Sequence, residues 1–234
     1  MVTYQVGDAR LRLLTAGEYE TSAFTANYNM KLASSVAPGS TLSVNSLILN
    51  SSGAVATSAY TLTIGSGNVL TLSGNAGINT TTVLNFGANE GIIRAATGTL
   101  AINSSITGAG GITTAGVGVI TLSFANTYTG TTTVNAGTLT YGINDAILTG
   151  DVTVNYGTLD LAGYSGTIGA LTLISGTINV TSGALTSTSY AIQSGTISGI
   201  LGGTGGLTKD GAGTLTLSGA NTYSGGTTIS AGTL

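Results

Sequence analysis

The sequence contains no cysteine, no histidine and no tryptophan, and its single proline is Pro38. Without cysteine, the chain has no disulfide framework, no thiolate metal site and no cysteine nucleophile. Without histidine, it lacks the imidazole base of Ser-His and Cys-His catalysis. A collagen triple helix is excluded as well, because it needs abundant proline and a glycine at every third residue.

Charged residues are also scarce. The 5 basic and 8 acidic residues make up 6% of the 234 residues, against about 25% in an ordinary soluble domain. The net charge is −3, and Arg94 is the one basic residue between Lys31 and Lys209. This distribution gives no electrostatic footprint for nucleic acid or for an anionic membrane surface. We therefore predict no nucleic-acid partner.

Long apolar runs are missing too. The longest unbroken run of hydrophobic residues has three members, as in Leu47–Leu49, whereas a membrane-spanning helix needs roughly 20. The first residues of the chain lack the apolar core of a signal peptide. We predict no membrane insertion by this segment. Hydrophobic residues still make up 41% of the chain, which with a low net charge is enough to bury a core and argues against disorder.

Glycine and small hydroxyl residues are abundant, and they are arranged in a repeat. The 38 Gly, 43 Thr and 24 Ser residues account for 105 of the 234 positions. Residues 108–139 and 203–234 align without gaps at an offset of 95, with 20 of 32 positions identical. Self-similarity at a fixed period is the signature of a repeat architecture.

A shorter period lies within this repeat. Gly-Thr-Leu or a close variant recurs at a period of about 19 residues, beginning at Gly98, Gly118, Gly137, Gly157, Gly176, Gly195, Gly213 and Gly232. Apolar residues recur two positions after the glycine, at Leu100, Ile120, Leu139, Leu159, Ile178, Ile197, Leu215 and Leu234, and four after it, at Ile102, Leu122, Tyr141, Leu161, Val180 and Leu217, with Gly199 in the same column. A third column lies three positions before it, at Val134, Val154, Leu173, Ile192 and Ile229, with Ala95, Ala115 and Asp210 as weaker members. Alternation with polar residues indicates strands with these columns facing inward.

These features predict an all-β protein folded as a single-stranded parallel β-helix (β-solenoid) of about 19 residues per coil. Coils would stack about 4.8 Å apart, the usual spacing of paired strands. The repeated glycine would lie where the chain turns, or where a side chain would clash with the coil below. A barrel or a sandwich fits the strand content alone but not the steady period. We divide the chain into an entry or cap segment (1–31), less regular coils (32–97) and regular coils (98–234).

The residues Gly206–Leu234, which read GLTKDGAGTLTLSGANTYSGGTTISAGTL, closely resemble the autotransporter-associated β-strand repeat. The copy at 108–139 departs from it, with Thr114 where the other has Lys209 and Phe124 where it has Gly219. The resemblance implies a right-handed β-helix, exported and displayed at the bacterial cell surface or secreted. Autotransporters also carry a signal peptide and a membrane barrel, so we expect this chain to be a fragment. We expect its last strand, cut at Leu234, to pair edge to edge with another chain.

Three acidic residues are candidates for a carbohydrate-active site, because some right-handed β-helix enzymes use clustered Asp residues. Such a cluster needs acids at equal places in neighbouring coils, one period of the repeat apart. The positions of Asp145, Asp151 and Asp160 differ by 6, 9 and 15, and no basic residue accompanies them. We interpret them as solvated loop acids and predict no catalytic, cofactor-binding or metal-binding residues.

Three other motifs also have a functional and a structural interpretation. The glycine strings 108–111 and 202–206 suggest phosphate or calcium loops, but a phosphate loop needs a following helix and the calcium repeat needs regularly placed Asp in several tandem copies, so we interpret them as turns. The triplets 126–128 and 221–223, both Asn-Thr-Tyr, either bind glycans or form loops with Asn bonded to the backbone and Tyr over the corner. A threonine follows most of the repeated glycines, at Thr99, Thr138, Thr158, Thr177, Thr196, Thr214 and Thr233. A second threonine two residues later, which a flat ice-binding array would need, is present in only some coils.

The function predicted from these observations is a non-enzymatic structural segment, a stalk or adhesive surface, of a bacterial surface-displayed or secreted autotransporter-like protein. Its expected partners are the neighbouring coils of the parent protein, and glycans or other surface molecules. Two alternatives stay open, a carbohydrate-active β-helix enzyme and a glycan-binding or ice-binding module.

Overall fold

The computed structural model describes residues 29–32, 34–35, 37, 40–51, 53–55, 60–79, 83–148 and 150–234. Within them it contains 21 β-strands and no helix, and all strand pairs are parallel. The prediction of an all-β parallel solenoid is confirmed; its right-handedness, which came from the resemblance, stays a prediction. Of the predicted entry segment, residues 1–28 lie outside the described residues, and 29–31 belong to the first strand.

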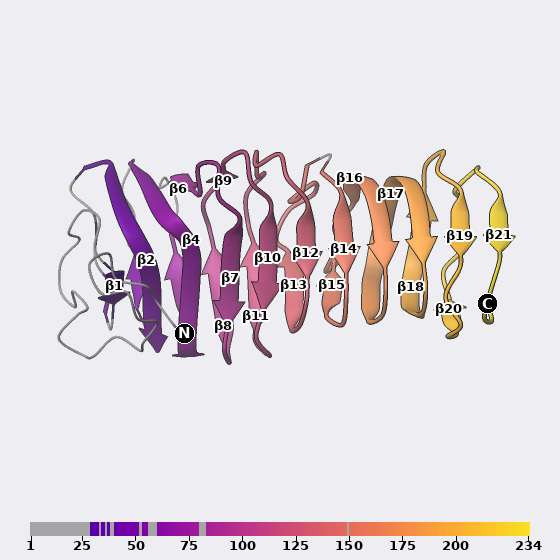
Figure 1. Ribbon diagram of the computed structural model, residues 1–234, viewed down its shortest axis with the longest axis horizontal. Helices are drawn as coiled ribbons and strands as arrows, with labels where there is room; N and C mark the ends of the chain where they lie inside the picture. Colours follow the sequence, from indigo (N-terminus) through magenta and orange to yellow (C-terminus); the bar gives the residue numbers. More distant parts are fainter. Residues whose placement is uncertain are drawn as a thin grey trace, which may run out of the picture.

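Each coil passes through three parallel ladders, and the coils follow one another along the long axis (Figure 1). Ladder 1 contains β1 (Asn29–Leu32), β7 (Gly91–Ala95), β10 (Ile112–Ala115), β12 (Thr132–Val134), β14 (Val152–Val154), β19 (Leu207–Lys209) and β21 (Thr227–Ile229). Ladder 2 contains β3 (Ala54–Val55), β5 (Ala76–Ile78), β8 (Thr99–Ile102), β11 (Val119–Leu122), β13 (Thr138–Tyr141), β15 (Thr158–Asp160) and β20 (Leu215–Leu217).

Ladder 3 is shorter, and several long strands bend from one ladder into the next. It contains β6 (Val83–Asn85) and β9 (Ile106–Thr107). The strands β2 (Leu42–Ser51) and β4 (Thr61–Gly74) run from ladder 3 into ladder 1, as does β16 (Gly166–Leu173). Strand β17 (Thr177–Ile192) passes through all three ladders, and β18 (Gly195–Gly202) through ladders 2 and 3. A single bridge, Asn126 to Ile147, carries ladder 3 between β9 and β16.

The step between paired residues is closest to the predicted 19 in the second half of the chain. Leu139 lies opposite Ile120 and Ile178 opposite Leu159, a step of 19 in both cases, while the step from Leu100 to Ile120 is 20. Earlier steps differ more, with 17 from Asn29 to Ser46 and 24 from Asn68 to Ile92. The differences are absorbed at the corners and where long strands bend, as in the register shifts between Val44 and Ser46 and between Asn179 and Ala184.

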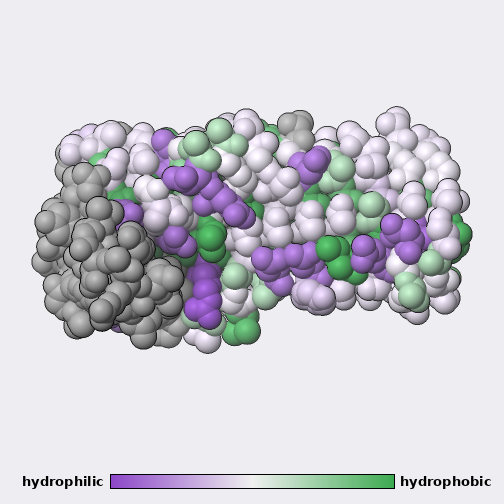
Figure 2. Space-filling model, viewed as in Figure 1, coloured by the Kyte–Doolittle hydropathy of each residue, from purple (hydrophilic) through white to green (hydrophobic). Residues whose placement is uncertain are grey.

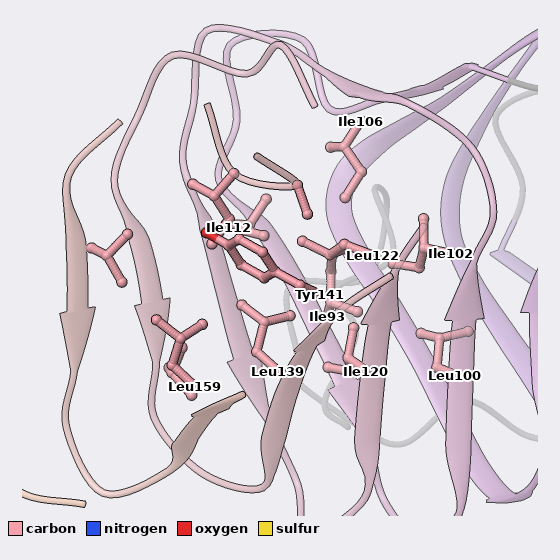
Figure 3. Packing of buried hydrophobic residues seen from close by; sticks show 14 of the residues in the cluster. Ile93, Leu100, Ile102, Ile106, Ile112, Ile120, Leu122, Leu139, Tyr141 and Leu159 are labelled. Atoms are coloured by element: carbon pink, nitrogen blue, oxygen red, sulfur yellow. The ribbon is translucent and has the colours of Figure 1, made fainter. Parts of the chain in front are cut away.

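The predicted apolar columns form the core. Along ladder 2, the column two residues after each glycine is buried from Leu100 to Leu215. From Leu100 to Ile197 each member lies in register with its equivalent in the next coil. Figure 3 shows Leu100, Ile120, Leu139 and Leu159 of this column. Burying one such side chain stabilises the fold by about 1.5–3 kcal/mol. Ile229 and Leu234 differ, with 51% and 47% of their surface exposed, because no described coil lies beyond them.

The repeated glycines lie at the corner between ladder 1 and ladder 2. Gly176 has a φ of +110°, which side-chain-bearing residues rarely adopt. A Cβ atom on Gly176 would lie 2.3 Å from the carbonyl oxygen of Gly157, the equivalent glycine one coil earlier. At this corner the glycine therefore serves both predicted purposes, turning the chain and allowing two coils to approach.

One predicted column is wrong in two coils. We placed Ala115 and Asp210 among the inward residues of ladder 1, but the structure places Thr114 and Lys209 there, both fully buried. Lys209 lies between Ile192 and Ile229, and its ammonium group donates hydrogen bonds to the carbonyls of Gly211 and Ala231. The corner is one residue longer in these two coils, so a fixed count back from the glycine lands on an outward residue.

Candidate binding faces

Because the side chains of a strand alternate, each ladder shows the solvent a face of its own. On ladder 2 the predicted threonine column is outward, and Thr138, Thr158 and Thr177 lie in register. The column then departs from the prediction, because Thr196 pairs with Thr216, while Thr214 pairs with Thr233. The cause is the shorter step from Gly195 to Gly213, which displaces the glycine relative to the strand.

The three candidate acids lie at different places around the coil, and each accepts a hydrogen bond from the backbone. Asp145, at the corner between ladders 2 and 3, accepts from the Thr167 N–H at 2.8 Å. Asp151 lies just before β14 and accepts from the Ala170 N–H at 2.7 Å. Asp160, at the end of β15, accepts from the Ala162 N–H at 2.9 Å. In these contacts the carboxylates brace the backbone of a turn or of the next coil.

The Asn-Thr-Tyr triplets are built into the fold. The buried amide of Asn126 accepts from the Ile106 N–H at 2.8 Å and donates to the Ala146 carbonyl at 2.7 Å, so it bridges the coils before and after it. Asn221, its equivalent in the second repeat copy, accepts in the same way from the Leu201 N–H. This is the predicted structural role of the Asn side chain in the loop.

The tyrosines of the two triplets also repeat one contact. The Tyr128 hydroxyl lies 2.6 Å from the Thr132 hydroxyl, and the Tyr223 hydroxyl 2.8 Å from that of Thr227. Tyr128 is 7% exposed, and burial raises its pKa well above that of free tyrosine. Its ring therefore packs inside the corner and has no free face on which a sugar could stack.

The glycine strings lie at the corner between ladder 3 and ladder 1, immediately before β10 and before β19. Strands follow both strings, so neither has the helix of a phosphate loop. Across the described ranges, no three of the acidic side chains come together in a way that would hold a metal ion. The same residues include no helix long and apolar enough to cross a membrane.

The sequence analysis missed a regular surface on ladder 1. The central outward position of successive strands is occupied by threonine in six of seven coils, at Thr113, Thr133, Thr153, Thr172, Thr208 and Thr228, with Ala191 between the fourth and fifth. We call these six residues the threonine row. Counting from the glycine hid the row, because its members lie four residues before the glycine in most coils but five before Gly118 and Gly213. Counting from the two inward residues that flank each of these threonines would have found the threonine row.

Comparisons with known proteins show which family this solenoid belongs to. The family model named passenger-associated-transport-repeat matches residues 112–140 and 207–234, the regions of the two repeat copies. The chain is an autotransporter-associated repeat protein. The adhesin BmaC autotransporter of Brucella suis biovar 1 (strain 1330) is 35% identical to it over 211 residues, covering 74% of this chain.

The autotransporter repeat chain spans 6% of the length of that curated relative. It corresponds to an adhesin-like β-helix segment of a passenger, and the resemblance seen in the sequence is confirmed. No solved structure matches it. The likeness to BmaC covers more of the chain than the two repeat copies do.

Proposed function

We propose that this chain is a non-enzymatic part of an autotransporter passenger, located outside the bacterial cell, where it acts as a stiff stalk and contributes adhesive surface. The observation that carries the proposal is the continuity of ladder 1, which runs without interruption from β1 to β21. A parallel ladder fixes each coil on the previous one through backbone hydrogen bonds, so the segment resists bending. The name of BmaC, an adhesin, supports a role in attachment.

The non-enzymatic role is supported by the side chains. The chain has no histidine or cysteine, and Asp145, Asp151 and Asp160 are each hydrogen-bonded to the backbone at separate places. Glycoside cleavage needs two carboxylates across one bond, within about 10 Å of each other. Turnover of a polysaccharide by the purified chain, abolished by Asp145→Asn or Asp151→Asn, would contradict this part of the proposal.

The stalk role and the adhesive role can be tested separately by deleting whole coils. Removing residues 113–207 takes out five coils and joins Ile112 to Thr208, which lies in register with Thr113, so ladder 1 stays continuous across the junction. The deletion shortens the solenoid by about 24 Å, five coils of about 4.8 Å. Bacteria displaying the full chain and the shortened chain are compared for attachment to cell layers.

A stalk that only extends a distant tip would retain most attachment after this deletion, whereas an adhesive surface on the deleted coils would lose it. Attachment by the full chain no greater than that of bacteria without it would refute the adhesive part of the proposal. The stalk role is tested by measuring, with atomic force microscopy, how far the full and the shortened solenoids extend from the cell surface.

A further inference from the structure

A strip of amide and carboxylate side chains runs beside the threonine row. Asn135, Asn155, Gln193 and Asp210 each follow the last buried residue of a ladder 1 strand, and we call these four residues the amide strip. Their backbone N–H groups donate to the equivalent carbonyl of the preceding coil, at Thr114, Val134, Leu173 and Ile192 respectively. They therefore occupy the same place in their coils, with Ile174 between Asn155 and Gln193. Figure 2 shows this face as mostly near-neutral, with hydrophilic side chains gathered in a row along the axis.

The strip is partly ordered before any ligand binds. Asn155 Nδ2 donates a hydrogen bond to Asn135 Oδ1, so the two amides are oriented as a pair on neighbouring coils. Asn135 Nδ2 and Asn155 Oδ1 have no partner among the described residues. A donor and an acceptor are thus available one coil apart, and a fixed orientation lowers the entropy cost of binding.

An exposed aromatic ring adjoins this amide pair. Tyr156 directly follows Asn155 and is 77% exposed, the highest value among the large aromatic residues of the described chain. The Cα of Tyr156 lies at the corner between ladders 1 and 2. The nearest inward residues on the two sides, Val154 in ladder 1 and Leu159 in ladder 2, are completely buried. The backbone that carries Tyr156 is therefore held on both sides by the core.

The charge on the outward face of ladder 1 restricts the chemical class of the ligand. From β10 to β21, the outward positions of ladder 1 include the acids Asp151 and Asp210 and no basic residue, since Lys209 is buried. One coil earlier, Arg94 lies in register with Ala115 and Glu90 accepts a hydrogen bond from Thr113, so along most of this face a polyanion meets no counter-charge. A protein partner usually meets an apolar centre, and the centre of this face is the threonine row.

We propose that the threonine row, the amide strip and Tyr156 bind a neutral polysaccharide whose chain lies along the solenoid axis. Amides and hydroxyls complement sugar hydroxyls, and the apolar face of a sugar ring stacks on an aromatic ring. Adjacent coils are about 4.8 Å apart. Side chains of the same type therefore recur at a regular spacing along the axis and can contact an extended chain at several points. The inference rests on the adhesive role proposed above and names its ligand class.

The test measures binding of the purified chain to insoluble cellulose, chitin and β-1,3-glucan. Tyr156→Ala should weaken binding about tenfold, and the double variant Asn135→Ala/Asn155→Ala should weaken it further. The matched control is Tyr164→Ala, which removes a tyrosine with 37% exposure from a different corner, between ladders 2 and 3. It should bind as the unaltered chain does. All these side chains are on the surface, so circular dichroism spectra should agree.

Three results would overturn the inference. Equal loss in Tyr156→Ala and Tyr164→Ala would indicate non-specific contact with aromatic rings. Binding to ice or to protease-sensitive cell components, with none to the three polysaccharides, would indicate a different ligand class. Attachment of displaying bacteria that persists in the Tyr156→Ala variant would leave the adhesive function standing and refute this site, whereas absence of attachment by the unaltered chain would refute the adhesive function itself.

Discussion

Three glycine substitutions separate the two reasons for glycine at the corners of this solenoid. At Gly226 a Cβ would meet no atom within 4 Å, and the residue has no positive φ. Gly87 has the same open space but a φ of +62°. Gly176 combines a φ of +110° with a carbonyl oxygen 2.3 Å from the Cβ position. Changing each to alanine adds the same methyl group in three different settings.

The expected costs in unfolding free energy rise through this series. Gly226→Ala should be neutral or stabilise by up to about 1 kcal/mol, because alanine restricts the unfolded chain. Gly87→Ala should cost about 1–2 kcal/mol, the penalty for a left-handed backbone with a Cβ. Gly176→Ala should cost more than Gly87→Ala, since relief of the contact with Gly157 requires the two coils to separate and lengthens the adjacent ladder hydrogen bonds.

The assay is urea unfolding followed by circular dichroism, with amide hydrogen exchange to locate the effect. Coils in a solenoid contact mainly their neighbours, so exchange in Gly176→Ala should increase most for β15, β17 and β18. Equal costs for Gly87→Ala and Gly176→Ala would refute the claim that close approach of the coils matters. A cost for Gly226→Ala as large as for Gly176→Ala would refute both parts of the reasoning.

Three further predictions test the core and its boundaries. Ile178→Asp should destabilise the fold by several kcal/mol because it places a carboxyl group in a fully buried ladder, whereas Thr177→Asp, on the outward side of the same strand, should cost under about 1 kcal/mol in urea unfolding. Lys209 is fully buried, so limited digestion with trypsin followed by mass spectrometry should give no early cleavage after residue 209, and early cleavage there would contradict this burial. Burial raises the pKa of Tyr128, so its contribution to stability is complete below about pH 10 and is lost as the pH rises further; Tyr128→Phe should reduce the alkaline loss in thermal melts, and an unchanged slope would contradict it.

The interior of ladder 2 was predictable from sequence because parallel stacking repeats one environment in every coil. Leu139, Leu159 and Ile178 lie directly above one another, so the same residue type is selected at the same step. The column after the glycine could be counted reliably in most coils, since few residues separate the glycine from the strand. The step before Gly213 was the exception, and there the outward column was misassigned.

Ladder 1 and ladder 3 were less predictable, for two physical reasons. Corners vary in length, and one added residue exchanges the inward and outward sides of a strand, as at Lys209 and Thr114. In ladder 3 a side chain replaces part of a strand. The Asn126 side-chain amide makes the hydrogen bonds to neighbouring coils that backbone groups make elsewhere. The threonine row and Tyr156 are surface features that core packing does not constrain, so counting from the repeated glycine did not find them.

The in-register ladders also determine how such a protein can change in length over evolution. Thr113 and Thr208 are five coils apart and occupy the same position in their coils, so recombination between them adds or removes whole coils and keeps the register of ladder 1 across the junction. Most insertions of comparable size would break a folded domain, but here the junction is indistinguishable from an ordinary step between coils. The number of coils is therefore free to drift while the cross-section is conserved, and recent duplications should appear as pairs of segments separated by a whole number of coils.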